Sequence, residues 1–192
     1  VTRVRAGGPG GTIDVPMFAT TLAVAALQTS EYFATGRNPR KMGSAHPRNA
    51  PYQAFRAADG WFAIAAGNDR LWQAVCEVVG APEWVGDPRF ATTTLRAANQ
   101  DALKEMLEAR FATDNAAAWL ARFRAAGVPS APINGYADAL ADPQAVDLGL
   151  VLPATLPGGH ATRTVGCPIR LGGEAVAVNA TFPVLGEHTA AL

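Results

Sequence analysis

The feature that most constrains the fold is a hairpin pattern followed by periodic helices in the middle of the chain. Tyr52–Arg56 and Trp61–Ala65 are β-prone runs that flank Asp59-Gly60, a pair favoured in tight turns. Apolar residues then recur at helical spacing in three segments, which hold Trp72, Val75, Cys76 and Val79; Leu103, Met106, Leu107 and Phe111; and Trp119, Leu120 and Phe123. Residues 50–130 are therefore predicted to form a small α+β unit of a hairpin and three helices.

Capping and breaking residues set the ends of these helices. Asn68 or Asp69 is predicted to cap the first helix, and Thr113 or Asp114 the third. Glycines at positions 80 and 127, each followed two residues later by proline, end the same two helices. Residues 87–90, Asp-Pro-Arg-Phe, are predicted to form a rigid corner before the second helix.

The first fifty residues are predicted to hold a turn, a strand, an apolar helix and a loop. A glycine-rich turn at residues 7–11 precedes a strand at residues 12–15. Pro16 suits the first turn of a helix, and residues 17–32 carry few charges, so this helix is expected to be buried. Residues 34–51 are irregular and rich in proline and glycine, and a long loop of this kind is often functional.

The last third of the chain is predicted to be strand-like and broken by Pro and Gly. A short helix at residues 137–140 should be ended by Pro143, and the best strand candidates are residues 163–171 and 175–178. Residues 185–192 are expected to start a helix.

Composition excludes several classes of partner. Lys+Arg and Asp+Glu both number 16, so a net charge of +0 gives no reason to expect nucleic acid or an anionic membrane surface. No apolar run is long enough to span a membrane, and no signal peptide is visible, so no membrane partner is predicted. Cys76 and Cys167 are far apart, which indicates free, inert thiols in a reducing cytoplasm.

Known catalytic and cofactor patterns are mostly absent. Gly8-Pro9-Gly10 lacks the third glycine of a dinucleotide fingerprint and precedes a strand instead of following one. The three histidines, His46, His160 and His188, share no metal spacing. Asp14 is a conceivable nucleophile, but capping or a structural hydrogen bond is its expected role.

The best local candidate for a binding site is the loop Gly43-Ser44-Ala45-His46-Pro47. Glycine beside small polar residues lets backbone amides approach an anion or a thioester oxygen. A mobile linker is the alternative interpretation of the same residues. The residues alone thus lead to a soluble α/β domain with a ligand-facing loop.

Short motifs occur in a fixed order along the whole chain: Gly10-Gly11-Thr12-Ile13-Asp14-Val15; His46-Pro47 with Pro51-Tyr52-Gln53-Ala54-Phe55; Asp59-Gly60-Trp61 with Ala66-Gly67-Asn68-Asp69 and Trp72; Asp87-Pro88-Arg89-Phe90 with Arg96 and Asn99; Trp119 with Gly127-Val128-Pro129 and Pro132; and Leu185-Gly186-Glu187-His188-Thr189. This ordered set resembles CoA-transferase family III, the CaiB/BaiF type. Each motif is weak by itself, but the ordered set is specific.

The resemblance implies an α/β fold class: an α+β small domain plus the C-terminal part of a Rossmann-like large domain, an incomplete family III CoA-transferase fold. It divides the chain into three parts: residues 1–49, the end of a large-domain segment with a long helix and linker; residues 50–135, the small α+β domain; and residues 136–192, a linker and the return to the large domain. Such enzymes form interlocked homodimers, and this chain is expected to be a C-terminal fragment that also needs its N-terminal half as a partner.

The resemblance also implies the chemistry. Family members move coenzyme A from an acyl-CoA to a carboxylic acid through an aspartyl intermediate, with the CoA thioester as substrate and no covalently bound cofactor. The nucleophilic aspartate is expected upstream, so no catalytic residue is assigned in this chain, and the isolated chain is predicted to be inactive. A substrate-binding loop is expected at Gly43, Ser44, His46, Pro51 and Tyr52, and its shortness argues against an oxalate-type acceptor. No metal is expected.

Two alternatives stay open at this level. An α-methylacyl-CoA racemase of the same fold uses an Asp/His pair that also lies upstream. A non-catalytic remnant or assembly module of a truncated gene belongs to a different functional class. An in-frame upstream segment, or an adjacent gene carrying the N-terminal half, would favour the enzyme.

Overall fold

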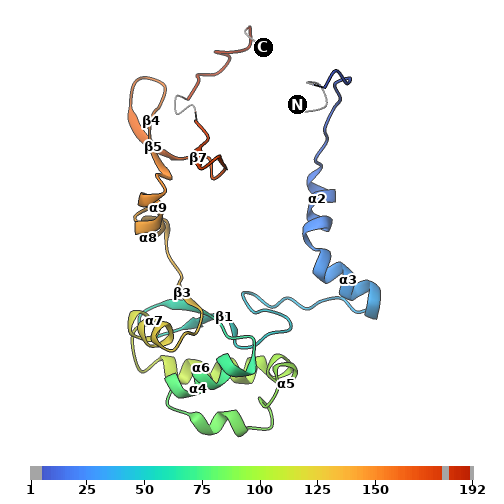
Figure 1. The fold of residues 1–192 in the computed structure, drawn as a ribbon, viewed down its shortest axis with the longest axis vertical. Coiled ribbons are helices and arrows are strands. Elements are labelled where there is room, and N and C mark those ends of the chain that lie inside the picture. Colours follow the sequence, from blue (N-terminus) through green and yellow to red (C-terminus); the bar gives the residue numbers. More distant parts are fainter. Residues whose placement is uncertain (1–5, 179–181, 191–192) are drawn as a thin grey trace. The chain divides into compact units, whose positions relative to one another are not determined.

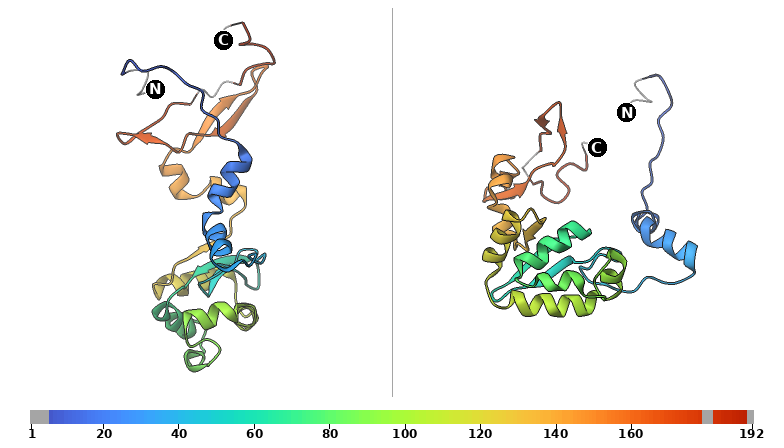
Figure 2. Two further views of the ribbon diagram at one scale, coloured as in Figure 1. Left: turned by 90° about the vertical axis from the view of Figure 1, so that its right-hand side faces the viewer. Right: turned by 60° about the horizontal axis from the view of Figure 1, so that its bottom comes forward.

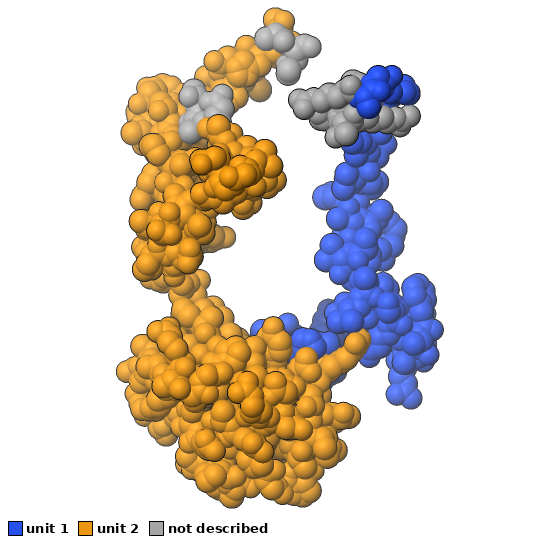
Figure 3. Space-filling view, viewed as in Figure 1, with its two compact units in different colours: residues 1–47 blue, residues 48–192 orange. Residues whose placement is uncertain are grey.

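A computed structural model describes residues 6–178 and 182–190 of the chain. The chain groups into two compact units, residues 1–47 and residues 48–192, which Figure 3 colours separately. Each unit is described by itself. The division into three parts expected from the sequence stays a prediction.

The first unit contains two consecutive helices, α2 (Met17–Val24) and α3 (Ala26–Thr35), which Figures 1 and 2 show meeting at an angle. The single helix predicted at residues 17–32 is therefore wrong, because Ala25 between the helices has φ −79° and ψ 19°. The hydroxyl of Thr29 donates to the carbonyl of Ala25 at 3.2 Å, and such back-bonding tends to bend helices.

Three other predictions for this unit are wrong. Residues 12–15 have no regular secondary structure, because a strand needs a partner strand and none in the described part of the chain pairs with them. Asp14 does not cap α2, which has Pro16 at its N-cap and no side-chain cap. The apolar helix is not buried within this chain either, since Met17 is 86% and Phe33 83% exposed. The irregular loop that follows α3 is confirmed.

The second unit is built on a three-stranded antiparallel sheet in the order β1-β2-β3. β1 (Tyr52–Arg56) and β2 (Trp61–Ala65) form the predicted hairpin, which is confirmed with the register Tyr52↔Ala65 to Arg56↔Trp61. The third strand, β3 (Ser130–Pro132), was not predicted, because a three-residue strand flanked by proline at 129 and ending in Pro132 carries no strand signal.

Two helices of this unit, α6 and α7, pack against the sheet, and Figure 1 shows α4, α5 and α6 below it. The helices of this unit are α4 (Asp69–Val78), the 3-10 helix η1 (Pro82–Gly86), α5 (Thr93–Ala98), α6 (Gln100–Phe111) and α7 (Ala116–Ala125). The three predicted helices are thus confirmed, while η1 and α5 were missed. Asn68 caps α4 as predicted, but α7 is capped by Asn115 instead of Thr113 or Asp114.

The core lies between the sheet and these helices, and Phe111 is at its centre. The Phe111 ring makes edge-on contacts with Phe62 at 4.9 Å, Trp119 at 5.3 Å, Phe55 at 5.5 Å and Phe123 at 5.9 Å between ring centroids. All four partners are buried. The helical faces predicted from apolar spacing are the faces that fill this core.

The rest of the second unit is made of short elements. They are α8 (Tyr136–Leu140), α9 (Pro143–Asp147), the hairpin of β4 (Val151–Thr155) with β5 (Ala161–Val165), and the hairpin of β6 (Arg170–Leu171) with β7 (Glu174–Ala175). The helix predicted at residues 137–140 is confirmed.

Four further predictions for this region are corrected. Pro143 starts α9 at its first turn instead of ending a helix, because Asp142 caps that turn by accepting from the Gln144 amide. The strand expected at residues 163–171 is split between β5 and β6, and the one expected at residues 175–178 is reduced to its first residue, the end of β7. Residues 185–190 form turns, and the rest of the predicted helix at 185–192 lies outside the described residues.

In the described part of the chain, none of the helices has the length and apolar character needed to cross a membrane.

Candidate functional site

The residues predicted to bind substrate are divided between the two units. Gly43 adopts φ 61°, a left-handed conformation that favours glycine, in a turn closed by a hydrogen bond from the Ala45 amide to the Met42 carbonyl at 3.1 Å. Ser44 is exposed and His46 is half-buried. Pro51 and Tyr52 belong to the second unit, where the first is buried and the second is 44% exposed. Their joint action as one site stays a prediction.

The end of this loop, residues 49–51, is tightly held in the second unit, and we call it the loop end. The amide of Ala66 donates to the Pro51 carbonyl at 2.8 Å. Gly67 lies so close to Asn49 that a Cβ added at position 67 would be 3.0 Å from the Asn49 Cβ. Ala50 is only 1% exposed. The loop end is therefore fixed to the residues that follow β2.

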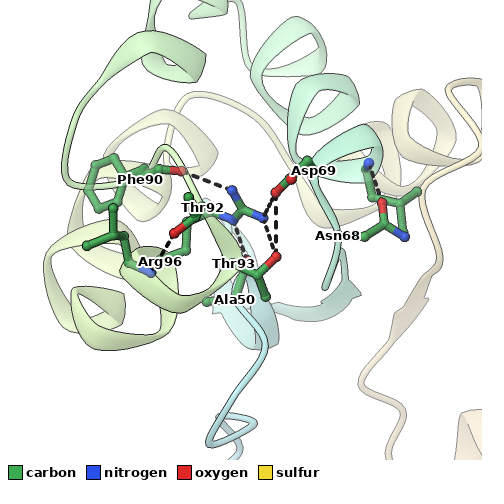
Figure 4. Close-up of polar contacts among 9 residues, drawn as sticks. Ala50, Asn68, Asp69, Phe90, Thr92, Thr93 and Arg96 are labelled. Atoms are coloured by element: carbon green, nitrogen blue, oxygen red, sulfur yellow. Dashed lines mark hydrogen bonds and ion pairs between the residues drawn. The ribbon is translucent and has the colours of Figure 1, made fainter.

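Arg96 on α5 also binds the loop end, as Figure 4 shows. Its guanidinium is fully buried, and Nε donates to the Ala50 carbonyl at 3.0 Å while Nη1 donates to the Phe90 carbonyl at 2.9 Å. Nη2 donates to Asp69 Oδ1 at 2.7 Å and to Thr93 Oγ1 at 3.0 Å. One side chain thus connects the loop end, the corner before α5 and the start of α4.

The structure explains the spacing of Arg96 and Asn99, because both side chains bind carbonyls of the same corner. Asn99 Nδ2 donates to the Arg89 carbonyl at 3.1 Å, next to the Phe90 carbonyl that Arg96 binds. The same corner is tightened by Asp87, which accepts from the Arg89 amide at 2.9 Å. Sequence reasoning recorded the spacing of Arg96 and Asn99 but missed that both hold this corner, and it also missed the close approach at Gly67.

The electrostatics of this region follow from Arg96 and from burial. The hydrogen bond from Arg96, together with its positive charge, lowers the pKa of Asp69 below the ordinary range of an aspartate. Burial raises the pKa of the Cys76 thiol to about 12, so this cysteine is protonated at neutral pH and is not an activated nucleophile. Asp14 lies exposed on the irregular segment before α2.

A metal centre is not formed by the residues in view. Across residues 6–178 and 182–190, no three His, Cys, Asp or Glu side chains are grouped so that they could hold a metal ion. His46, His160 and His188 lie in separate segments, and the last two are exposed. The described contacts of Arg96 and Ala66 therefore serve to hold the loop end by hydrogen bonds.

Comparison with known proteins gives consistent matches along the chain. The family model "CoA-transferase family III" matches residues 1–189. The acetyl-CoA:oxalate CoA-transferase of Acetobacter aceti is 40% identical over 86% of this chain, and the succinyl-CoA:glutarate CoA-transferase of Mus musculus is 31% identical over 95% of it. A crystal structure of a CaiB/BaiF family protein from Brucella suis matches 99% of the chain with a TM-score of 0.77 and 37% identity.

The match covers only part of each of these proteins. The chain spans 41% of the Acetobacter protein, 42% of the mouse protein and 49% of the Brucella structure. The mixed α/β architecture expected from the sequence is confirmed as part of the fold of that solved CaiB/BaiF protein. Because the family model extends over nearly all of its residues, the chain belongs to CoA-transferase family III.

Proposed function

We propose that this chain supplies the C-terminal part of an acyl-CoA:carboxylate CoA-transferase, in which Gly43, Ser44, His46, Pro51 and Tyr52 contact the thioester substrate. The observation that carries the proposal is the family match over residues 1–189, joined by relatives whose names describe CoA transfer to a dicarboxylic acid. The fixed loop end supports it further, because a binding loop must be held in place to position a reacting group.

The reaction proceeds by two-stage covalent catalysis. An aspartate carboxylate attacks the thioester carbonyl of the donor, the C–S bond breaks, and CoA leaves as thiolate to give a mixed anhydride. The thiolate attacks the aspartyl carbonyl of the anhydride, which releases the donor acid and leaves an aspartyl-CoA thioester. The acceptor carboxylate then attacks that thioester, and the thiolate returns to the new acyl group to regenerate the aspartate. No oxidant or cofactor is consumed.

The nucleophilic aspartate in this proposal comes from a segment that this chain does not span. The position of Asp14 supports that assignment, because it is exposed on an irregular segment and no helix or strand fixes it. The isolated chain is accordingly proposed to be inactive and to require its N-terminal half. The homodimeric state and cytoplasmic location belong to the same proposal, and the two free cysteines agree with a reducing compartment.

The names of the relatives bear on the alternatives and on the acceptor. They describe transferases, which supports transfer over racemisation. The short loop argued against an oxalate-type acceptor, whereas the 40% identical relative is named for oxalate. Oxalate and glutarate are therefore the first acceptors to test.

The test is a transfer assay with acetyl-CoA or succinyl-CoA as donor and oxalate or glutarate as acceptor. We expect no turnover by the chain alone and turnover once it is joined to the N-terminal half. In the joined protein, Gly43→Ala and Tyr52→Phe should lower kcat/KM, because the first strains a backbone at φ 61° and the second alters a residue proposed to contact substrate. Glu105→Gln, at an exposed side chain on α6 of the small domain, is the control and should change nothing. A joined protein that transfers CoA with unaltered kcat/KM in both loop variants would refute the assigned loop.

A further inference from the structure

A buried arginine needs a reason, because a charge removed from water is costly unless every donor finds a partner. Arg96 is 0% exposed, and three of its nitrogens donate to four different acceptors. Its carboxylate partner Asp69, in contrast, has a side chain 68% exposed. An ion pair placed in this way is a poor source of stability, since an apolar residue of similar size would fill the core without a desolvation cost.

The acceptors of Arg96 indicate what the residue does instead. Two of them are main-chain carbonyls from segments far apart in sequence, Ala50 at the loop end and Phe90 at the corner. A planar guanidinium presents its donors in a fixed fork, so it holds two carbonyls at a set separation and angle. The ring of Trp72 lies 5.8 Å from the guanidinium carbon and limits its movement on one side.

The loop end has other contacts as well. The Ala66 amide donates to the Pro51 carbonyl, and Gly67 leaves room for the Asn49 side chain. Arg96 provides the side-chain hydrogen bond to the Ala50 carbonyl, which lies between those two positions. The position of the Ala50 carbonyl, near the end of the loop of residues 43–51, is thus fixed by the buried guanidinium of Arg96.

We propose that Arg96 is a positioning residue that fixes the loop end and thereby sets where the substrate loop joins β1. The anchoring of the loop end is supported by the hydrogen bonds of Arg96, and its consequence for catalysis rests on the proposed function. The partner ion Asp69 orients the guanidinium from the helix α4 side, and Asn99 holds the adjacent carbonyl of the corner.

The test is amide hydrogen exchange in the 192-residue chain with Arg96→Lys. Lysine keeps the charge but cannot reproduce the fork. We expect exchange at the Ala66 amide, which donates to the Pro51 carbonyl, to become about tenfold faster or more, while the Leu103 amide of α6 and the Ala126 amide at the C-cap of α7 change by about twofold or less. Arg89→Lys, at an ion pair whose arginine is 52% exposed, is the matched control and should leave Ala66 unchanged.

Two results would overturn the proposal. An unchanged Ala66 amide would show that Arg96 does not hold the loop end, and equal acceleration at all three amides would show that it stabilises the whole domain. If Arg96→Lys does not fold, Asp69→Ala serves instead, because it removes the carboxylate that accepts from Nη2 and keeps both carbonyls. It should speed exchange at Ala66 alone by about threefold, and no change there would count against the proposal.

Kinetics of the joined transferase separate this proposal from the proposed function. A displaced loop should raise KM for acyl-CoA or lower kcat in Arg96→Lys, with Arg89→Lys unaffected. Faster exchange at Ala66 together with normal kinetics would confirm the anchoring and contradict the assignment of the loop to the substrate. If exchange at Ala66 in Arg96→Lys is no faster than in the unmodified chain, the anchoring is contradicted, and the kinetic result does not change that conclusion.

Discussion

Replacing Trp119 by alanine should remove one of the main supports of the small domain. The Trp119 side chain is 4% exposed, its ring contacts Phe111 and Phe123 at centroid distances of 5.3 and 6.3 Å, and its Nε1 donates to the Phe111 carbonyl at 3.0 Å. Truncation of a buried tryptophan costs about 3–5 kcal/mol.

The assay is thermal or urea unfolding followed by circular dichroism, with Trp61→Ala as the matched control. For a chain of this size each kcal/mol lowers Tm by roughly 2–4 °C, so Trp119→Ala should lower it by roughly 6–20 °C. Trp61 is 46% exposed, and its removal should cost about 1 kcal/mol or less. A loss below about 1 kcal/mol for Trp119→Ala, or equal losses in the two variants, would refute the assigned helix face and core.

Three further outcomes follow from exposed and titrating groups. The apolar side chains of α2 and α3, with Phe18 79% and Val24 80% exposed, should make the isolated chain self-associate, and light scattering should show a defined complex once the N-terminal half is added; a monomer at micromolar concentration would contradict this. Cys167, which is half-exposed, should react with a thiol reagent well before Cys76, whose raised pKa of about 12 keeps it protonated; equal rates in the folded chain would show that Cys76 is not buried. Because the pKa of Asp69 is lowered on folding, its contribution to stability is complete at neutral pH and is lost as pH falls through that lowered pKa, so Asp69→Asn should flatten the fall in Tm between neutral pH and about pH 3; parallel Tm curves would contradict it.

Local patterns predicted much of the second unit, and contacts distant in sequence explain most of the errors. The hairpin and the faces of α4, α6 and α7 depend on spacing that any short window contains. The cap of α7 was misplaced partly because the amide of Ala116 is satisfied by Asp59 of the hairpin, 57 residues away. The strand β3 exists only because β2 offers it an edge.

The candidate site was predictable to the same extent. The glycines and prolines of residues 34–51 were enough to predict the long loop that contains Gly43. The role of Arg96 could not be predicted in this way, because it depends on carbonyls 46 and 6 residues away. Composition predicted a buried helix, and the exposure of α2 and α3 in this chain shows that burial depends on which surfaces are available to cover a helix and not on its composition alone.

The central claim, that this chain carries the loop and not the nucleophile, is tested most directly by locating the covalent intermediate. The joined protein is incubated with acetyl-CoA or succinyl-CoA, treated with hydroxylamine, which cleaves an aspartyl thioester to an aspartyl hydroxamate, and digested for mass spectrometry. We predict a modified aspartate in the N-terminal half and unmodified peptides throughout residues 1–192. A hydroxamate at Asp14, lost together with activity in Asp14→Asn, would contradict the account.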